Sequence, residues 1–221
     1  MATVSKQVTS LQNSVAPRLP ISPIEYDQRF MDEFIRILRL YFNQIDNVTS
    51  GLLGQTGGAY LHFPYGSFQS SSNQNITTAN TPQLVTFSSS PYVNDTFLSS
   101  TTKINVNSSG LYLYNYSLQL ANTDITSPHE VQIWLRKNGT DIPNTGTKVD
   151  VPAHYGTLDG YLNATGAFFA SLSAGDYIEL VVASNSTSVY MEAYAAQTSP
   201  YARPAIPSTE VTLSFISSVQ G

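Results

Sequence analysis

The chain has 221 residues, of which 11% are charged and 11% aromatic, with 14 tyrosines and no cysteine. This length is sufficient for one domain with a full hydrophobic core and a small additional segment. The formal net charge of -5 excludes a broad basic surface for nucleic acid, and the lack of cysteine excludes disulfides and thiolate metal sites.

Residues 1–22 are polar, rich in Ser and Thr, and interrupted by Pro17 and Pro20, with neither helical nor strand periodicity. We expect an extended arm that does not fold alone and that anchors the protein to a larger particle. The alternative is an arm folded back on its own oligomer. These residues lack the charged start and apolar core of a signal peptide, and no stretch approaches the roughly 20 apolar residues of a membrane span, so we expect no membrane partner.

Residues 23–50 show helical periodicity, with Ser22 as the expected cap and Pro23 at the first helical position. Two adjacent rows of apolar side chains give a face too wide for a solvated single helix. We therefore expect copies of the chain to pack through this face as a trimeric stalk, although packing of an amphipathic helix on its own β-domain is the alternative. The expected packing residues are Phe30, Met31, Phe34, Ile35, Ile37, Leu38, Tyr41, Phe42 and Ile45.

Residues 51–58 contain four glycines and are expected to form a flexible joint. From residue 59 to 221, short apolar runs alternate with polar residues and are separated by turn residues, which predicts nine or ten strands without an intervening helix. The sequence thus predicts a mainly β chain: an antiparallel jelly-roll sandwich preceded by an extended arm and one helix. The residues expected in the core of this head are Leu113, Leu118, Ile133, Leu135, Phe169, Leu172, Ile178, Leu180, Leu213 and Phe215.

Four motifs in the head occur in a recognisable order. Leu111 to Tyr116 follows Ser-Ser-Gly, a strand at residues 131–136 leads into Lys137-Asn138-Gly139, Leu172 precedes Ala174-Gly175-Asp176, and a final strand at 211–216 ends near the end of the chain. This order resembles the globular head of the first complement component and the wider tumour-necrosis-factor-like superfamily. The resemblance implies a compact homotrimer with an aromatic-rich inner face, on strands carrying residues such as Tyr112, Tyr114, Tyr116 and Phe215.

The stretch at residues 135–148, the Pro-containing arm and the helix also resemble small virion proteins of tailed bacteriophages of the marine type. This resemblance implies a structural protein on the virion surface, made in the host cytoplasm and attached to capsid, neck or tail proteins through residues 1–47. A capsid decoration, head fibre or tail-associated fibre would fit. The alternative is a receptor-binding adhesin, in which Tyr and Asn in loops at 88–94 and 198–207 bind host surface glycans.

Catalytic motifs are absent from the sequence: it contains no Gly-x-Ser-x-Gly elbow, phosphate loop or dinucleotide fingerprint. His62, His129 and His154 are far apart, and His129 is interpreted as a loop residue rather than a base. Asp141, Asp150, Asp159 and Asp176 fall in predicted turns, where calcium binding is the alternative to a plain turn role. We therefore predict no enzymatic activity, no cofactor and no assigned metal site.

Overall fold

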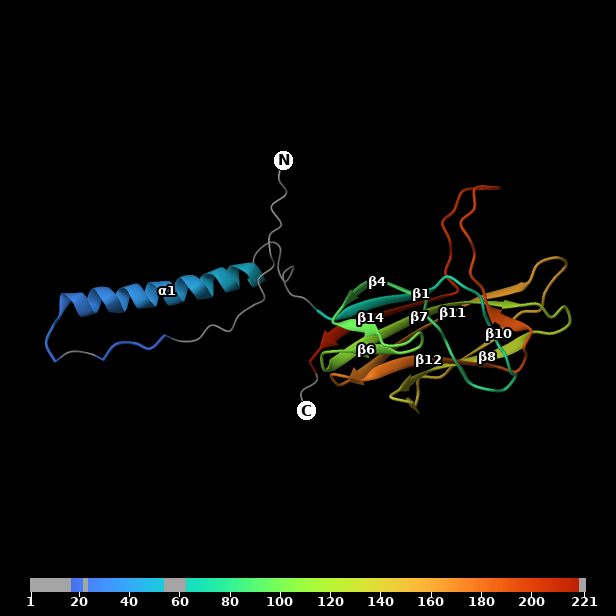
Figure 1. Cartoon of the computed structure of the whole chain (residues 1–221), viewed down its shortest axis with the longest axis horizontal. Coiled ribbons are helices and arrows are strands. Elements are labelled where there is room, and N and C mark those ends of the chain that lie inside the picture. Colours follow the sequence, from blue (N-terminus) through green and yellow to red (C-terminus); the bar gives the residue numbers. More distant parts are fainter. Residues whose placement is uncertain (1–16, 22–23, 54–62, 219–221) are drawn as a thin grey trace. The chain divides into compact units, whose positions relative to one another are not determined.

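The computed structural model describes residues 17–21, 24–53 and 63–218. The chain forms two compact units, Met1–His62 and Phe63–Gly221. Within the described residues, the first unit contains one α-helix and the second contains fourteen strands (Figure 1). Most of the predicted arm and joint, residues 1–16 and 54–62, lies outside the described residues.

Helix α1 (Gln28–Leu53) starts later and ends later than the predicted 23–50. Asp27 caps it, because its Oδ1 accepts a hydrogen bond of 2.9 Å from the backbone N–H of Arg29, two positions into the helix. The expected cap, Ser22, and Pro23 lie outside the described residues. The helix also continues through Gly51, the first residue of the predicted joint, so a single glycine does not end it.

One sheet of the second unit, which we call sheet A, is centred on the long strand β7 (Gly110–Asn122). One edge of β7 pairs with β14 (Thr209–Ser217) and then with β13 (Val189–Met191), and its other edge pairs along its full length with β11 (Gly160–Leu172). The remaining strands extend the sheet outward: β1 (Tyr65–Ser70) pairs with β14, β4 (Ser89–Asn94) pairs with β1, and β2 (Gln74–Asn75) pairs with β13.

The second sheet, which we call sheet B, is centred on β8 (His129–Lys137) and β12 (Tyr177–Ser184). Strands β10 (Thr147–Val151) and β9 (Thr140–Asp141) pair with β8, whereas β3 (Gln83–Leu84) and β6 (Ile104–Val106) pair with β12. Strand β5 (Thr96–Leu98) pairs with β6 and completes the sheet.

The connections between strands cross repeatedly from one sheet to the other. The chain passes from β6 in sheet B to β7 in sheet A and returns to sheet B at β8. It passes again from β12 in sheet B to β13 in sheet A. All pairings are antiparallel within the described residues, and this wiring is that of a jelly-roll sandwich. The predicted fold class, a mainly β antiparallel sandwich with one helix, is confirmed, and its trimeric state stays a prediction.

Two turns expected from local sequence have the backbone conformations that their residues favour. Asn138 and Gly139 have φ angles of 49° and 81° in the tight hairpin between β8 and β9. Gly175, with φ at 88°, lies in the turn that leads into β12. Asn and Gly are the residues that adopt positive φ with least strain, so these turns fix where the adjacent strands begin and end.

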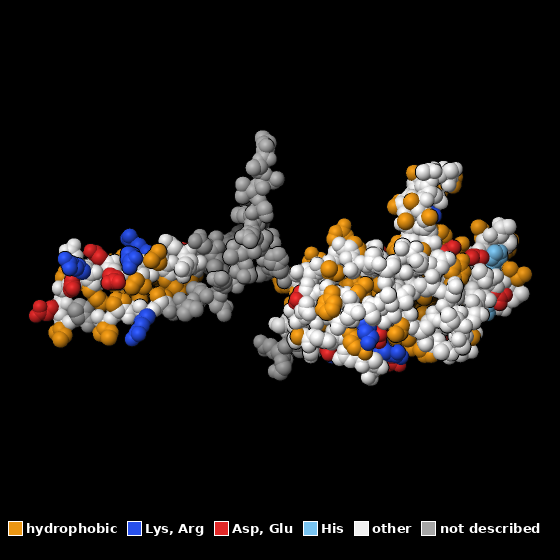
Figure 2. All heavy atoms as spheres, viewed as in Figure 1, with side chains coloured by type: hydrophobic (Ala, Val, Ile, Leu, Met, Phe, Trp, Pro, Cys, Tyr) orange, Lys and Arg blue, Asp and Glu red, His pale blue; other side chains and the backbone are white. Residues whose placement is uncertain are grey.

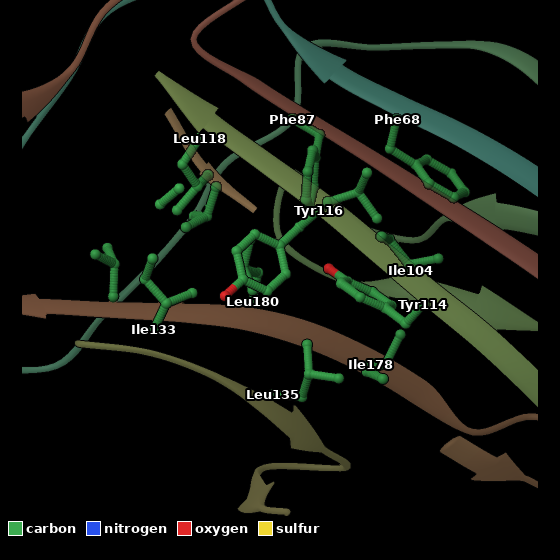
Figure 3. Packing of buried hydrophobic residues seen from close by; sticks show 14 of the residues in the cluster. Phe68, Phe87, Ile104, Tyr114, Tyr116, Leu118, Ile133, Leu135, Ile178 and Leu180 are labelled. Carbon is green, nitrogen blue, oxygen red and sulfur yellow. The ribbon is translucent and has the colours of Figure 1, made fainter. Parts of the chain in front are cut away.

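The hydrophobic core lies between the sheets, where side chains from β7, β8 and β12 interdigitate (Figure 3). Of the residues predicted for this core, seven are buried there: Leu118, Ile133, Leu135, Leu172, Ile178, Leu180 and Leu213. The prediction is wrong for Phe169, whose side chain is 63% exposed, and Leu113 and Phe215 are only partly buried.

Alternation along β7 and β11 explains these differences. Tyr112, Tyr114 and Tyr116 point into the core, so Leu113 between them points out of the sandwich. Phe169 is paired with Leu113 across the sheet and therefore shares its outward direction. The three tyrosines are consequently core residues, and their implied place on an aromatic inner face of a trimer is wrong.

The hydroxyls of Tyr112 and Tyr114 lie in different surroundings, although both side chains are fully buried on the same face of β7. The Tyr112 hydroxyl donates a hydrogen bond of 2.7 Å to the backbone oxygen of Ser108. The Tyr114 hydroxyl has no hydrogen-bond partner among the described residues, and burial raises the pKa of Tyr114 above its ordinary value. A buried hydroxyl without a partner costs free energy of desolvation that no bond offsets.

We therefore predict opposite effects for two Tyr→Phe substitutions on this strand. Tyr114→Phe should raise the free energy of unfolding by about 1 kcal/mol, because it removes an unpaired buried hydroxyl, whereas Tyr112→Phe should lower it by about 1 kcal/mol. Urea denaturation of the two full-length variants followed by tyrosine fluorescence measures both. Equal destabilisation by the two substitutions would contradict the predicted difference between the hydroxyls.

Candidate functional site

The outward side of sheet A carries an apolar surface that the register of the strands places in one row. Phe169 on β11 pairs with Leu113 on β7, Leu113 pairs with Ser214 on β14, and Ser214 pairs with Tyr65 on β1. Residues paired across antiparallel strands share a face, and Phe169 and Tyr65 are both exposed. We call this surface the outer face of sheet A.

The neighbouring rows of the outer face are polar but almost uncharged. The next row contains Ala167, Asn115, Thr212, Ser67 and Tyr92, and the one after it contains Thr165, Ser117, Glu210 and Gln69. Glu210 is the single charged residue in these three rows. A sheet face that remains in water usually carries charged side chains, so a face of aromatic, aliphatic and small polar groups is typical of a protein contact surface.

The polar residues of β7 give the signal that sequence reasoning missed. Asn115, Ser117 and Gln119 have the same parity as Leu113 and all lie on the outer face. Leu113 therefore points outward like these three residues, although the run from 111 to 114 is apolar on both sides of the strand. The same argument applies to Phe169, since Asn163 and Thr165 share its parity on β11.

The apolar face of α1 is a second uncovered surface. Of the residues predicted to pack in a stalk, Met31, Ile35 and Phe42 are exposed. The others are half-buried: Phe30, Phe34, Ile37, Leu38, Tyr41 and Ile45. Pro17 lies against Ile37 and Tyr41, so the described part of the arm covers one margin of this face and leaves the other margin in solvent. No second helix is present among the described residues, and the predicted packing of copies through α1 stays a prediction.

Two His–Asp pairs lie at the end of the sandwich where β7 finishes. His129 Nε2 is 2.9 Å from Asp124 Oδ2, and His154 Nδ1 is 2.7 Å from Asp159 Oδ1. The backbone N–H of His154 donates to the backbone oxygen of Asp124 at 2.8 Å, which brings the loops at 123–128 and 152–159 together. We call these two segments the distal loops. Sequence reasoning treated the histidines as isolated, although each has an aspartate five positions away in its own segment.

Asn122, the last residue of β7, ties the distal loops to the core. Its fully buried side chain donates hydrogen bonds of 3.0 Å to the backbone oxygens of Ser127 and Pro152, one in each loop. Gly160 follows the second loop, and a side chain at that position would clash with the carbonyl oxygen of Pro152. Part of what holds the loops is therefore contacts to their backbone, which do not depend on the side chains of Ser127 and Pro152.

The acids of the distal loops are already engaged by the chain itself. Asp124 Oδ1 accepts hydrogen bonds from the hydroxyl and the N–H of Thr126, and Asp159 Oδ2 accepts one of 2.9 Å from the hydroxyl of Tyr190. Burial and then the bond to Asp159 raise the pKa of Tyr190, so this hydroxyl stays a donor. Among residues 63–218, neither His ring has a serine or threonine hydroxyl as a hydrogen-bond partner, and the pairs fit a structural role better than nucleophilic catalysis.

The four aspartates predicted in turns occupy varied positions. Asp141 and Asp150 belong to strands β9 and β10, Asp159 is in a distal loop, and Asp176 precedes β12. In the part of the chain that the structure describes, no cluster of three or more His, Cys, Asp or Glu side chains has the arrangement of a metal site.

Of the two loops predicted to meet host glycans, one is a strand and the other remains a loop. Residues 89–94 form the edge strand β4, and residues 198–207 belong to a segment that projects from the sandwich. Helix α1, the single helix described, is not long and apolar enough to cross a membrane.

Comparisons with known proteins give little beyond these observations. No protein-family model matches the chain, and no curated protein matches it. Among solved structures, the Eiger TNF from S. frugiperda is similar to 72% of this chain and to 96% of its own length, with 14% sequence identity and a TM-score of 0.45.

We predict that the Asp124 carboxylate stabilises the head in a pH-dependent manner. Hydrogen bonds from Thr126, and then from His129, lower the pKa of Asp124 to about 2. Because this pKa lies below the unfolded value of about 4, the stabilisation is complete above that pH and is lost as the pH falls toward 2. Asp124→Asn should therefore destabilise the protein at pH 6, and the difference from wild type should shrink between pH 4 and pH 2.

Urea unfolding of both proteins across this pH range measures the difference. Thr126→Ala, which removes only the side-chain donor to Asp124, should give a smaller effect in the same direction. A difference that does not change with pH would show that the carboxylate charge makes no contribution.

Proposed function

We propose that this protein is a non-enzymatic structural component of a tailed-phage virion. In this proposal it forms a trimeric surface appendage, attached to another virion protein through residues 1–47, with its β-sandwich head outward. The outer face of sheet A is the observation that carries the proposal. It carries exposed aromatic residues among small polar ones and is almost uncharged, yet nothing in the described part of the single chain covers Phe169 or Tyr65.

Burial of the outer face against other copies would remove this apolar surface from water. Each Å² of apolar surface buried contributes about 25 cal/mol, and tyrosine is among the residues that contribute most to binding when buried at the centre of a protein contact. Cyclic association of identical chains is the usual way to cover such a face without forming open fibres. The choice of three copies rests on the resemblance of the strand motifs to the complement-head and tumour-necrosis-factor-like superfamily.

The helix supports the same oligomer. The predicted packing residues extend over an arc of roughly 160° at 3.6 residues per turn, which is wider than a two-stranded seam requires. Leu40, which is also exposed, lies outside this arc. Exposed Asp32, Glu33, Arg36 and Arg39 occupy the opposite side of α1, as the outer surface of a bundle requires. Three helices packed through the broad face would cover Met31, Ile35 and Phe42, which the arm leaves exposed.

The virion setting rests on the resemblance of the arm, the helix and residues 135–148 to small virion proteins of tailed phages. A cysteine-free chain suits assembly in a reducing host cytoplasm, and weak contacts from three arms would act together to hold one trimer on a particle.

A receptor-binding adhesin is the second candidate, and the distal loops favour it. Ile125, Tyr155 and Leu158 are exposed on loops that Asn122 and the His–Asp pairs hold in place. A rigid, exposed tyrosine ring is a suitable platform for the apolar face of a sugar. Purified protein with Tyr155→Ala should then lose binding to host cells while its oligomeric state is unchanged.

We predict that Phe169→Asp disrupts the oligomer and leaves the head folded. A charge on the outer face would have to lose its hydration in the contact, so the dissociation constant should rise by at least 30-fold, equivalent to about 2 kcal/mol. Sedimentation velocity measures the oligomer, and circular dichroism checks the fold. Thr187→Asp, in an exposed turn away from the outer face, is the matched control and should leave the trimer intact. A wild-type chain that sediments as a monomer at micromolar concentration would overturn the proposed trimer.

We predict that deletion of residues 1–22 yields a folded trimer that is absent from purified particles. The deletion removes the proposed anchor but leaves α1 and the sandwich. Particles assembled with the deleted chain, and with the full chain as the control, are compared by mass spectrometry of their protein content. Equal incorporation of both chains would show that the arm is not the anchor.

A further inference from the structure

Residues 194–206, between β13 and β14, form a segment that stands away from the sandwich, and we call it the projecting arm (Figure 1). Its two halves are paired by backbone hydrogen bonds. Tyr194 and Ile206 exchange two bonds of 2.9 Å, and Gln197 and Arg203 exchange bonds of 3.0 and 3.1 Å. The projecting arm is therefore an ordered two-stranded element, although it pairs with neither sheet.

The base of the projecting arm is on the outer face of sheet A. Gln119 of β7 accepts a backbone hydrogen bond from Glu192 and donates one to Ser208, at the point where the partner of β7 changes from β14 to β13. The ring of Tyr194 lies 6.3 Å from that of Tyr161, whose side chain is on the outward side of β11. The projecting arm thus rises from the same face that carries Phe169 and Leu113.

Arg203 stiffens the projecting arm from within. Its Nη1 donates to the backbone oxygens of Ala195 and Pro204 at 3.0 and 3.1 Å, and its guanidinium lies 5.3 Å from the centre of the Tyr194 ring. Arg203 is the only charged residue in 194–206, and these contacts direct it back onto the arm. Two prolines further restrict the backbone, so little conformational entropy remains to be lost on binding.

Most side chains of the projecting arm are small or apolar, and Figure 2 shows them interspersed with polar and backbone atoms. Alanine, proline, tyrosine and isoleucine make up nine of the thirteen residues from 194 to 206, and the Tyr201 side chain near the tip is 65% exposed. A thin element with solvent on most sides buries little of its own apolar surface. A rigid arm with one charged residue and an exposed tyrosine near its tip has the composition of a protein contact element.

We propose that the projecting arm of one copy packs against the neighbouring copy in the oligomer and that Tyr201 is buried in that contact. The inference rests on the proposed function, because it takes the outer face of sheet A as the surface that a second copy covers. From Tyr194 to Pro200 the arm spans roughly 20 Å at the rise of an extended chain, whereas packed sheets lie about 10 Å apart. A copy seated on the outer face therefore has to lie beside the arm.

Photocrosslinking tests this contact directly. The photoreactive amino acid p-benzoylphenylalanine is placed at position 201 of the full chain, and irradiated protein is separated by denaturing electrophoresis. We expect covalent dimers and trimers from this variant. The matched control carries the same group at Tyr155, which is exposed in a distal loop and should give a monomer band. Oligomeric protein without crosslinks from position 201 would overturn the inference.

Two substitutions at the tip give an independent measurement. Tyr201→Asp should raise the dissociation constant of the oligomer by at least tenfold in sedimentation equilibrium, whereas Tyr201→Phe, which keeps the ring, should change it less than threefold. A wild-type chain that is monomeric at all concentrations refutes the proposed trimer and the inference together. An oligomer whose affinity is the same in all three proteins refutes the inference alone, and loss of host-cell binding in Tyr201→Asp would then assign the arm to an external ligand.

Discussion

Strand β7 and its two-residue alternation determine most of this structure. Its thirteen residues pair with three strands of sheet A, and its inward side chains fill the centre of the sandwich. The direction of Tyr112, Tyr114 and Tyr116 fixes the direction of Leu113 and, through the register with β11, that of Phe169. A shift of one residue would exchange the core of the head with its surface.

Because of the same alternation, the residues that stabilise the folded head differ from those available for contact with other copies of the chain. Inward positions of β7 and β12 supply the buried contacts, whereas outward positions of β7 and β11 supply a face that the single chain does not cover. Helix α1 has the same division, with an apolar side partly covered by the arm and a charged side opposite. Both units of the chain therefore present a surface that the described part of the single chain does not bury, and the proposed trimer assigns both surfaces to contacts between copies.

The sequence was sufficient for the class of fold and for features set by neighbouring residues. The Asn138–Gly139 hairpin, the turn at Gly175 and the helical run around Phe34 follow from conformational preference and periodicity over a few positions. The direction of the side chains in β7 did not follow, because both faces of that strand carry apolar residues from 111 to 114 and only Asn115, Ser117 and Gln119 mark the outward side. Strand β4 and the approach of the two distal loops depend on contacts between segments far apart in the sequence, which local patterns do not encode. Each His–Asp pair joins residues only five positions apart, but the conformation that brings them together follows from no motif in the sequence. The start of α1 was misplaced for a simpler reason, since Asp27 is also a good cap and competes with Ser22.

The position of Asn122 has an evolutionary consequence. Its side-chain amide donates hydrogen bonds to the backbone oxygens of Ser127 and Pro152. These two hydrogen bonds do not depend on which side chains the distal loops carry. Mutations at Ile125, Tyr155 or Leu158 can thus accumulate without loosening the scaffold beneath them. Related chains could therefore vary the exposed residues of the distal loops while they keep Asn122. A foreign peptide grafted into one of these loops should be held by the same hydrogen bonds from Asn122.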